Sequence, residues 1–195
     1  MSGGAVIASI VEGYGEVAAL PILIRKIAYE VHSAYDVEVM KPHRVPRGQM
    51  TGESLCRAVA LQSGRISGRR GGVLVVADSD DDCPVELAEL ILAAAKCDQS
   101  GAVVPEVAIA VREYESWFLA SIDSIRIHRA VRDDASYPSD PDTPRGAKGR
   151  LESLMTESYR ETLHQPSFTE MIDLTLAGRS RSFAHLLRSV SRLLA

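Results

Sequence analysis

The chain has 195 residues, of which 46% are apolar and 25% are charged, so it is long enough to bury the core of one domain. Its formal net charge of −4 does not indicate that the protein surface as a whole binds nucleic acid. No apolar run approaches the ~20 residues of a membrane span, so we expect no membrane segment.

Predicted strands and helices alternate over the first two thirds of the chain. An apolar, β-branched run at 5–11 predicts a buried strand, and apolar residues at helical spacing predict a helix over 17–31. Weak alternation predicts a strand at 36–40, and after a proline-rich loop Thr51 is suited to cap a helix ending near residue 63. The same patterns then predict a strand at 72–77, a helix at 84–96, a strand at 103–111 and a helix at 114–122. This alternation is typical of an α/β fold with a mostly parallel sheet flanked by helices.

The last third of the chain has a different character. A segment rich in Asp, Ser and Pro predicts a loop at 133–146, and helical patterns follow at 146–163, 168–176 and 182–194. We therefore expect an α/β core over residues 1–132 and, over residues 133–195, a loop and helical extension packed on that core.

The cysteines and the N-terminus bear on the compartment. The three cysteines have no metal-ligand spacing, and their odd number does not indicate a disulfide framework. The N-terminus lacks the basic start of a signal peptide. Together these features favour a reduced, cytoplasmic setting.

Acidic residues follow three of the predicted strands at their C-terminal ends. The set consists of Glu12, Glu16, Asp78, Asp80, Asp82, Glu113 and Glu115. Open α/β sheets place their active sites at this edge, so we expect the acids to converge in one pocket. Carboxylates at close quarters repel one another unless a divalent cation neutralises them, and hard oxygen ligands suit Mg²⁺ or Mn²⁺. The sequence therefore predicts a metal-dependent phosphoryl-transfer site.

Two acids after the 72–77 strand are the first choice as metal ligands. Asp78 and Asp80 stand two apart in an extended segment, so their side chains can point the same way and hold one Mg²⁺. Glu12 would bridge to that ion or act as the general base. Asp82 either adds a ligand or caps the next helix.

A second metal position would draw on the remaining acids. Glu16 lies four residues after Glu12, in the first turn of a helix, and Gly13 and Gly15 would allow a sharp bend that aims both acids inward. Glu16, with Glu113 or Glu115, would complete the second position. Two ions held in this way stabilise both the attacking and the departing oxygen in phosphoryl transfer.

A basic segment gives a reason to consider nucleic acid as the substrate. Residues 41–72 carry seven Lys or Arg residues and a single acid, Glu53. Cationic groups that hold a phosphate backbone, beside carboxylates that hold a metal, are what a nuclease for DNA or RNA needs. The alternative, in which these side chains only solvate a helix face, is equally open at this point.

Two other functions fit the same residues. An apolar strand followed by Asp78-x-Asp80 also resembles the haloacid dehalogenase phosphatases, in which the first Asp is a nucleophile; here the motif lies mid-chain and ends in further Asp residues. A phosphatase of this kind would act on a small molecule. The pocket would otherwise belong to a catalytically silent regulatory or scaffold subunit, which fits the negative net charge.

The order of the motifs resembles a Toprim domain, the catalytic module of topoisomerases, bacterial primases and the overcoming-lysogenization-defect (OLD) nucleases. Glu12-Gly13 matches its Glu-Gly pair and Asp78-x-Asp80 its Asp-x-Asp. Glu16 and the segment 112–115 resemble further acidic elements of the OLD branch. The resemblance implies a Toprim-like sheet, a magnesium-dependent nuclease activity, and a role for Lys148 in steadying the phosphate.

The whole chain also resembles a bacterial Toprim-like family, the domain of unknown function numbered 4276. The resemblance rests on motifs spread over nearly the full length, at residues 11–21, 78–84, 111–118, 145–148 and 179–183. These 195 residues show no motif that resembles the ATPase domain of the OLD proteins, so we expect that a separate partner chain could supply an ATPase.

Overall fold

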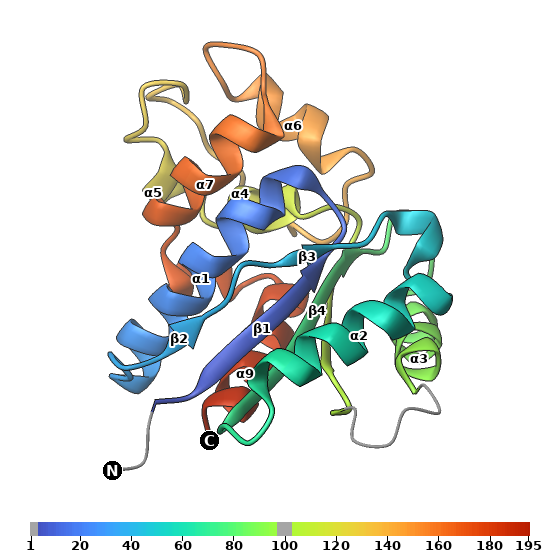
Figure 1. The fold of residues 1–195 in the computed structure, drawn as a ribbon. Coiled ribbons are helices and arrows are strands. Elements are labelled where there is room, and N and C mark those ends of the chain that lie inside the picture. The colour runs from blue at the N-terminus through green and yellow to red at the C-terminus, as the bar shows by residue number, and fades with distance from the viewer. Residues whose placement is uncertain (1–3, 97–102) are drawn as a thin grey trace.

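The structure is a computed structural model that describes residues 4–96 and 103–195. In the described part, one sheet contains five strands, all of them parallel, and Figure 1 shows helices on both of its faces. The strands are β1 (Val6–Val11), β2 (Glu38–Val39), β3 (His43–Arg44), β4 (Gly71–Asp78) and β5 (Glu106–Ala110). Their order is β2-β1-β4-β5, and β3 pairs with β1 further along the edge that β2 also occupies.

Helices connect the strands and make up most of the C-terminal part. Before β5 they are α1 (Tyr14–His32), the short 3₁₀ helix η1 (Arg47–Gln49), α2 (Glu53–Ile66) and α3 (Pro84–Ala95). After β5 they are α4 (Glu115–Ala120), α5 (Ile122–Ile125), α6 (Ala147–Ser153), α7 (Glu161–Met171), α8 (Leu174–Ala177) and α9 (Arg181–Leu194). The α/β fold with a mostly parallel sheet and a C-terminal helix, expected from the sequence, is confirmed.

The two faces of the sheet belong to two separate apolar cores. Along β1, Ile7 and Val11 face the core shared with α1 and α9, whereas Ala8 and Ile10 face the core shared with α2 and α3. This division follows from the alternation of side chains along a strand. Since both faces are covered, the central strands are buried throughout and read as continuous apolar runs, as in β4.

The C-terminal helices are part of the same packing. α7 lies against α1, and α9 lies against β4 and β5 on one face of the sheet (Figure 1). Phe168 of α7 and Phe183 of α9 are fully buried in the core that also holds Ile7. The division into a core and an extension at residue 132 stays a prediction, and apolar residues from both segments fill one core.

Two details of the sequence prediction need correction. The helix predicted over 146–163 is interrupted between α6 and α7, where Met155 forms an antiparallel bridge with Val131 and Leu154 accepts a hydrogen bond from Arg132. These tertiary contacts override the helical periodicity. The loop predicted after residue 40 contains β3, which is too short to show alternation, and α2 begins after Gly52 rather than being capped by Thr51.

Cysteines and membrane segments give two further outcomes. Cys56 is disulfide-bonded, although the number and spacing of the cysteines did not indicate a disulfide framework, and Cys83 is free and exposed. Cys97 lies outside the described residues. No helix in the described parts of the chain is long and apolar enough to cross a bilayer.

Gly15 permits the close approach of α1 to α7. A Cβ atom built on Gly15 would lie 2.2 Å from Oε1 of Gln165 and 2.9 Å from the backbone oxygen of Glu161. Gly64, inside α2, has nothing within 4 Å of the same position. We predict that Gly15→Ala lowers the melting temperature, because α7 must move away. Gly64→Ala should stabilise the chain by roughly 0.5–1 kcal/mol through helix propensity.

Thermal unfolding of the two variants beside the wild type checks this pair. The substitution is chemically the same at both positions, so only the surroundings differ. Equal shifts of the melting temperature in Gly15→Ala and Gly64→Ala would contradict the packing of α1 on α7.

Candidate active site

The candidate site lies at the C-terminal edge of the sheet, where β1 and β4 end side by side. Val11 pairs with Val76, so Glu12 and Asp78 leave the sheet next to each other. A carboxylate oxygen of Glu12, Oε2, accepts a hydrogen bond from the backbone N–H of Asp78 at 3.4 Å. The register of the parallel ladder therefore sets the spacing of these two acids.

A cavity of about 310 Å³ opens at this edge. Four of the seven predicted metal ligands line it, and they come from the ends of three strands: Glu12, Glu16, Asp78 and Glu115. Arg44 of β3 and Arg47 of η1 line the same cavity and bring positive charge to it. The sheet edge thus collects the acids that follow β1, β4 and β5, together with two guanidinium groups.

Glu16 is buried and holds the start of α1. Its Oε2 accepts hydrogen bonds from the backbone N–H groups of Glu12 at 3.1 Å and Gly13 at 3.3 Å. Gly13 has φ −94°, which any residue can adopt, so the sharp glycine bend expected from the sequence is absent here. Gly13 and Gly15 do not have a positive φ, and the close contact with α7 is what requires Gly15.

Glu115 is the first residue of α4 and is also buried. Its Oε1 accepts a hydrogen bond from Nε2 of Gln165, 3.1 Å away on α7. Through this hydrogen bond α7 takes part in the site, although Gln165 lies 50 residues further along the chain than Glu115. Sequence reasoning missed Gln165, since a glutamine inside an ordinary helix carries no local signal.

Asp78 contributes a polar atom without a partner. Its Oδ1 is buried and makes no hydrogen bond with any described residue. A buried oxygen in this condition is costly, because it has given up water without gaining a donor. It is therefore a position at which an added cation or donor would be favourable.

Burial raises the pKa of the four predicted ligands that line the cavity, Glu12, Glu16, Asp78 and Glu115. For Glu16 burial raises the pKa to about 8, with the charges of Glu12 and Glu115 adding to the effect. For Asp78 burial raises the pKa well above its usual range, and Glu16, Glu115 and Glu12 raise it further. For Glu12 the rise due to burial is opposed most by the Arg47 guanidinium. The cavity thus gathers more carboxyl groups than its own cations can keep ionised, and some of them tend to keep a proton.

These carboxyl groups do not form a finished ion cage. Within residues 4–96 and 103–195, no three His, Cys, Asp or Glu side chains are arranged as a group that could hold a metal ion. Glu16 is turned towards backbone N–H groups and Glu115 towards Gln165. Coordination of a shared ion would require at least one of these side chains to change rotamer.

The three other predicted ligands lie outside the cavity. Asp80 and Asp82 are exposed and both meet Arg47, with Asp80 Oδ2 3.4 Å from Nε and Asp82 Oδ2 2.5 Å from a terminal nitrogen. Glu113 accepts a hydrogen bond from the backbone N–H of Lys148 at 2.8 Å. Arg47 therefore links the exposed aspartates to the wall of the cavity.

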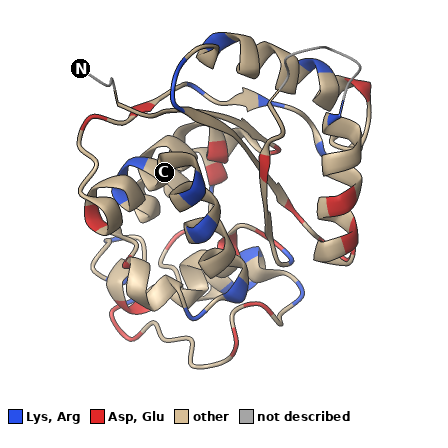
Figure 2. Cartoon of the chain, turned by 90° about the horizontal axis from the view of Figure 1, so that it is seen from below, with Lys and Arg blue, Asp and Glu red and all other residues tan. Residues whose placement is uncertain are grey.

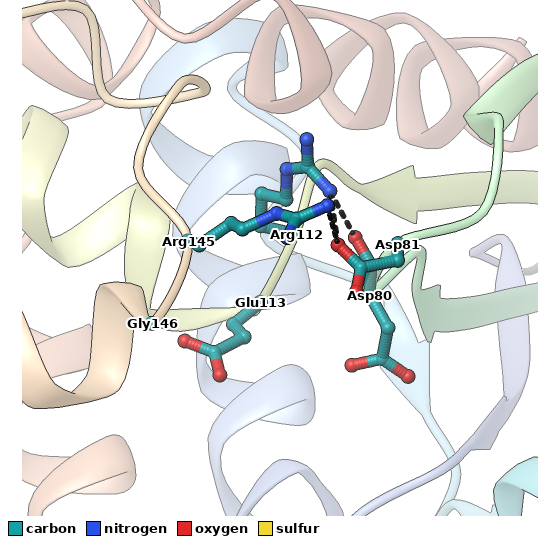
Figure 3. Close-up of a pocket in the computed structure, with 6 residues that line it drawn as sticks. All are labelled: Asp80, Asp81, Arg112, Glu113, Arg145 and Gly146. Carbon is teal, nitrogen blue, oxygen red and sulfur yellow. Dashed lines mark hydrogen bonds and ion pairs between the residues drawn. The ribbon is translucent and has the colours of Figure 1, made fainter.

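A second hollow lies beside the cavity and is drawn in Figure 3. Asp80 and Glu113 line it, and the guanidinium groups of Arg112 and Arg145 both meet the carboxylate of Asp81 there, at 2.8 and 3.1 Å. These interactions tie the loop after β4 to the loop before α6. The two loops are held together by ion pairs between solvent-exposed groups, and each such pair contributes little to stability by itself.

The backbone is unusual where the β4 and β5 loops meet. Asp80 has φ +48° and Arg112 has φ +67°, which is the left-handed region that side chains other than glycine rarely adopt. The backbone N–H of Asp80 donates to the oxygen of Arg112 at 2.9 Å, and the N–H of Arg112 donates to Oγ of Ser79 at 2.8 Å. These hydrogen bonds hold the strained pair in place directly beside Asp78.

Lys148 lies next to the cavity with its charge already paired. Its ammonium group forms an ion pair with Glu161, and this interaction raises the lysine pKa above its usual value. Glu161 itself lines the cavity. Lys148 thus contacts a residue that lines the cavity. It could contact a bound phosphate only if its ion pair with Glu161 opened.

The basic segment 41–72 divides between the two ends of the sheet. Arg44 and Arg47 reach the cavity, whereas Arg69 lies just before β4, at the opposite end of that strand, and pairs with Glu38. Figure 2 shows basic and acidic residues interspersed over the molecule. The positive charge available to a ligand at the site therefore comes from two arginines.

Five parallel strands covered by helices on both faces, with carboxyl groups gathered beyond the strand ends, define an α/β protein of the mostly parallel class. The family model described as Domain of unknown function (DUF4276) matches residues 11–191, and the chain belongs to that family. The resemblance expected from the sequence is confirmed at this level. No curated protein matches the chain.

Two solved structures are similar over nearly the whole chain. The C-terminal region of the Burkholderia pseudomallei OLD protein has 16% identity and a TM-score of 0.47, over 98% of this chain and 99% of that one. The C-terminal region of the Xanthomonas campestris pv. campestris OLD protein has 13% identity and a TM-score of 0.41, over 95% and 96%. At these levels the similarities carry no argument about the site or its activity.

The buried carboxyl of Glu16 predicts a specific dependence of stability on pH. Its pKa is about 8 in the folded chain and 4.5 as the ordinary value, so the folded state keeps a proton that the unfolded state loses. The free energy of unfolding therefore falls as pH rises from about 4.5 to 8. Without divalent cations, Glu16→Gln should raise the melting temperature at pH 8 by at least about 2 °C and change it little at pH 4.

Glu86 provides the matched control, because it is an exposed glutamate at the same position of the first turn of α3. Glu86→Gln removes a favourable interaction with the helix dipole and should lower the melting temperature slightly at pH 8. Thermal unfolding in EDTA at both pH values measures the difference. A Glu16→Gln variant less stable than the wild type at pH 8 would contradict the burial of a charged group.

Proposed function

We propose that the chain is a phosphoryl-transfer enzyme dependent on Mg²⁺ or Mn²⁺, and that it hydrolyses phosphodiesters in nucleic acid as a Toprim-type nuclease. The observation that carries the proposal is the meeting of Glu12, Glu16, Asp78 and Glu115 around one cavity that Arg44 and Arg47 also line. Carboxyl groups alone would favour cation storage or a purely structural role. Guanidinium groups beside them add the means to hold a phosphate.

The donor set fits a hard divalent cation. All four groups offer oxygen, the ligand type that Mg²⁺ and Mn²⁺ prefer. The unpartnered Oδ1 of Asp78 and the raised pKa of the carboxyl groups both point to missing positive charge. Asp78 and Glu12 would hold the ion, and Glu16 or Glu115 would join after a change of rotamer. A bound divalent cation would supply Lewis-acid activation of the phosphate and charge neutralisation.

The protein groups have separate tasks in this proposal. Glu12 has an alternative role to holding the ion: it is only half-buried, so it could instead act as the general base that accepts a proton from an attacking water. Arg44 and Arg47 would bind the non-bridging oxygens of the substrate phosphate. Lys148 would offset developing negative charge once its pair with Glu161 opens.

The three exposed acids take a supporting role. Asp80 and Asp82 hold Arg47 from the solvent side, and Glu113 fixes the start of α6 through the backbone of Lys148. They would orient the cationic groups of the site. Any of them that binds the ion directly would have to leave these partners. DNA or RNA would approach over Arg44 and Arg47.

Substitution of Asp78 is the direct test of the activity. Asp78→Asn removes one carboxylate and keeps the shape of the side chain. Because the charged form is disfavoured in the folded chain, the variant should fold at least as stably as the wild type without metal. We predict that cleavage of DNA or RNA in Mn²⁺ falls about 10²-fold or more, the usual scale for losing one group that stabilises developing charge.

Asp134→Asn is the control, since Asp134 is exposed and pairs only with Arg132 among the described residues. Plasmid, single-stranded DNA, RNA and a chromogenic phosphomonoester would be incubated with each variant. The assignment would be refuted if Asp78→Asn cleaved the nucleic acids as fast as the wild type. Turnover of the phosphomonoester alone would favour the small-molecule phosphatase, and a folded chain inert towards all four would favour the regulatory or scaffold role.

A further inference from the structure

An aromatic side chain stands exposed at the rim of the carboxylate cavity. Tyr14, the first residue of α1, is 66% exposed and lines the cavity together with Glu12 and Asp78. Tyr114, Trp117 and Phe118, which follow β5, are buried in the core. Tyr14 is therefore the aromatic residue at this site that a ligand can reach.

The ring of Tyr14 is already half of a stacked pair. The guanidinium carbon of Arg44 lies 3.9 Å from the centre of the ring, which places the cation over one face. With that face covered, an exposure of 66% leaves the remaining surface of the ring open to solvent. Arg44 belongs to β3 and is fixed by the pairing of that strand with β1, so the backing of the ring is part of the sheet.

Arg44 also connects the cavity to a neighbouring hollow. Besides the cavity, it lines a hollow together with Ser54 and Arg57 at the start of α2. Arg57 is largely exposed, and within residues 4–96 and 103–195 its one ion-pair partner is Glu53 of the same helix, a contact of the weak surface type. Cationic and hydroxyl groups thus extend from the carboxylates past Tyr14, over a path suited to a phosphate backbone.

We propose that Tyr14, backed by Arg44, is a stacking site for one unpaired nucleobase beside the carboxylate cavity, so that the substrate is single-stranded nucleic acid. The inference rests on the proposed function, since it names the substrate class of the same site. Every base has a flat face that stacks on an aromatic ring, whereas a base inside a duplex has both faces taken by its neighbours. The site therefore selects strands, or strand ends, that are already unpaired.

A structural role for Tyr14 makes a different prediction. An aromatic residue needed for folding is buried, and its removal from a core costs about 3–5 kcal/mol in proteins generally. Tyr14 is mostly exposed, so Tyr14→Ala should leave the melting temperature nearly unchanged. Tyr14→Phe keeps the ring and removes the hydroxyl group, which has no part in stacking.

Binding of labelled oligonucleotides by fluorescence anisotropy tests the inference without turnover. The probes are single-stranded oligo-dT, single-stranded oligo-rU and a blunt DNA duplex, each measured in EDTA and in Ca²⁺. We expect Tyr14→Ala to weaken binding of the single strands by about 5- to 150-fold, which corresponds to ~1–3 kcal/mol per stacked base. Tyr14→Phe should bind like the wild type, and the two single-stranded probes show whether DNA or RNA is preferred.

Two results of the binding measurement would overturn the stacking site. One is equal binding of the single strands by Tyr14→Ala and the wild type, and the other is an equal loss for the duplex, which would indicate a general effect on charge or fold. Failure of the nuclease proposal is distinguishable, because binding is measured without cleavage. If the wild type cleaves nothing but binds single strands through Tyr14, the stacking site still stands. If Tyr14→Ala cleaves single strands as fast as the wild type, the stacking site is refuted.

Discussion

The burial of several carboxyl groups at one edge of the sheet is the constraint on which the rest of the site depends. β1 and β4 are parallel and in register, so the acids that follow them leave the sheet at the same edge, and α4 adds Glu115 from beyond β5. Apolar packing on both faces of the sheet fixes these positions. The acids cannot separate without breaking the ladder, and their pKa values rise because of burial and of one another. The fold thus holds negative charge together at a cost in stability.

The surroundings reduce this cost only in part. Glu16 is satisfied by backbone N–H groups at the start of α1, Glu115 by an amide from α7, and Glu12 by the charge of Arg47. Asp78 keeps one buried oxygen that accepts no hydrogen bond from the part of the chain that the structure describes. A structure selected for stability alone would replace such a group, so its presence supports a site that is completed by a cation. Glu16 or Glu115 would have to leave its present partners before it could bind the ion. For Glu16, ion binding is therefore linked to a local rearrangement of the first turn of α1.

Sequence reasoning located the sheet and the strand ends because both have local signals. The apolar runs of β1 and β4 and the acids directly after them can be read from consecutive residues. Gln165 and Glu161 could not be found in this way, since they reach the cavity through the packing of α7 on α1. The basic segment 41–72 included Arg44 but could not single it out, because Arg44 reaches the cavity through a two-residue strand. The exposed positions of Asp80 and Asp82 also depend on the left-handed backbone conformation of Asp80 after β4. The sequence of the Asp-rich segment does not predict this conformation. Helical periodicity also predicted one helix over 146–163, which the bridge between Met155 and Val131 interrupts.

Anomalous scattering from a crystal grown in Mn²⁺ tests the central claim most directly, because it locates the ion without reference to any reaction. The account predicts a peak within bonding distance of the Asp78 and Glu12 carboxylates, with Glu16 or Glu115 turned from its present partner towards it. A crystal saturated with Mn²⁺ that shows no density in this cavity, or shows it only at the exposed aspartates, would contradict the claim that these buried acids form a cation site.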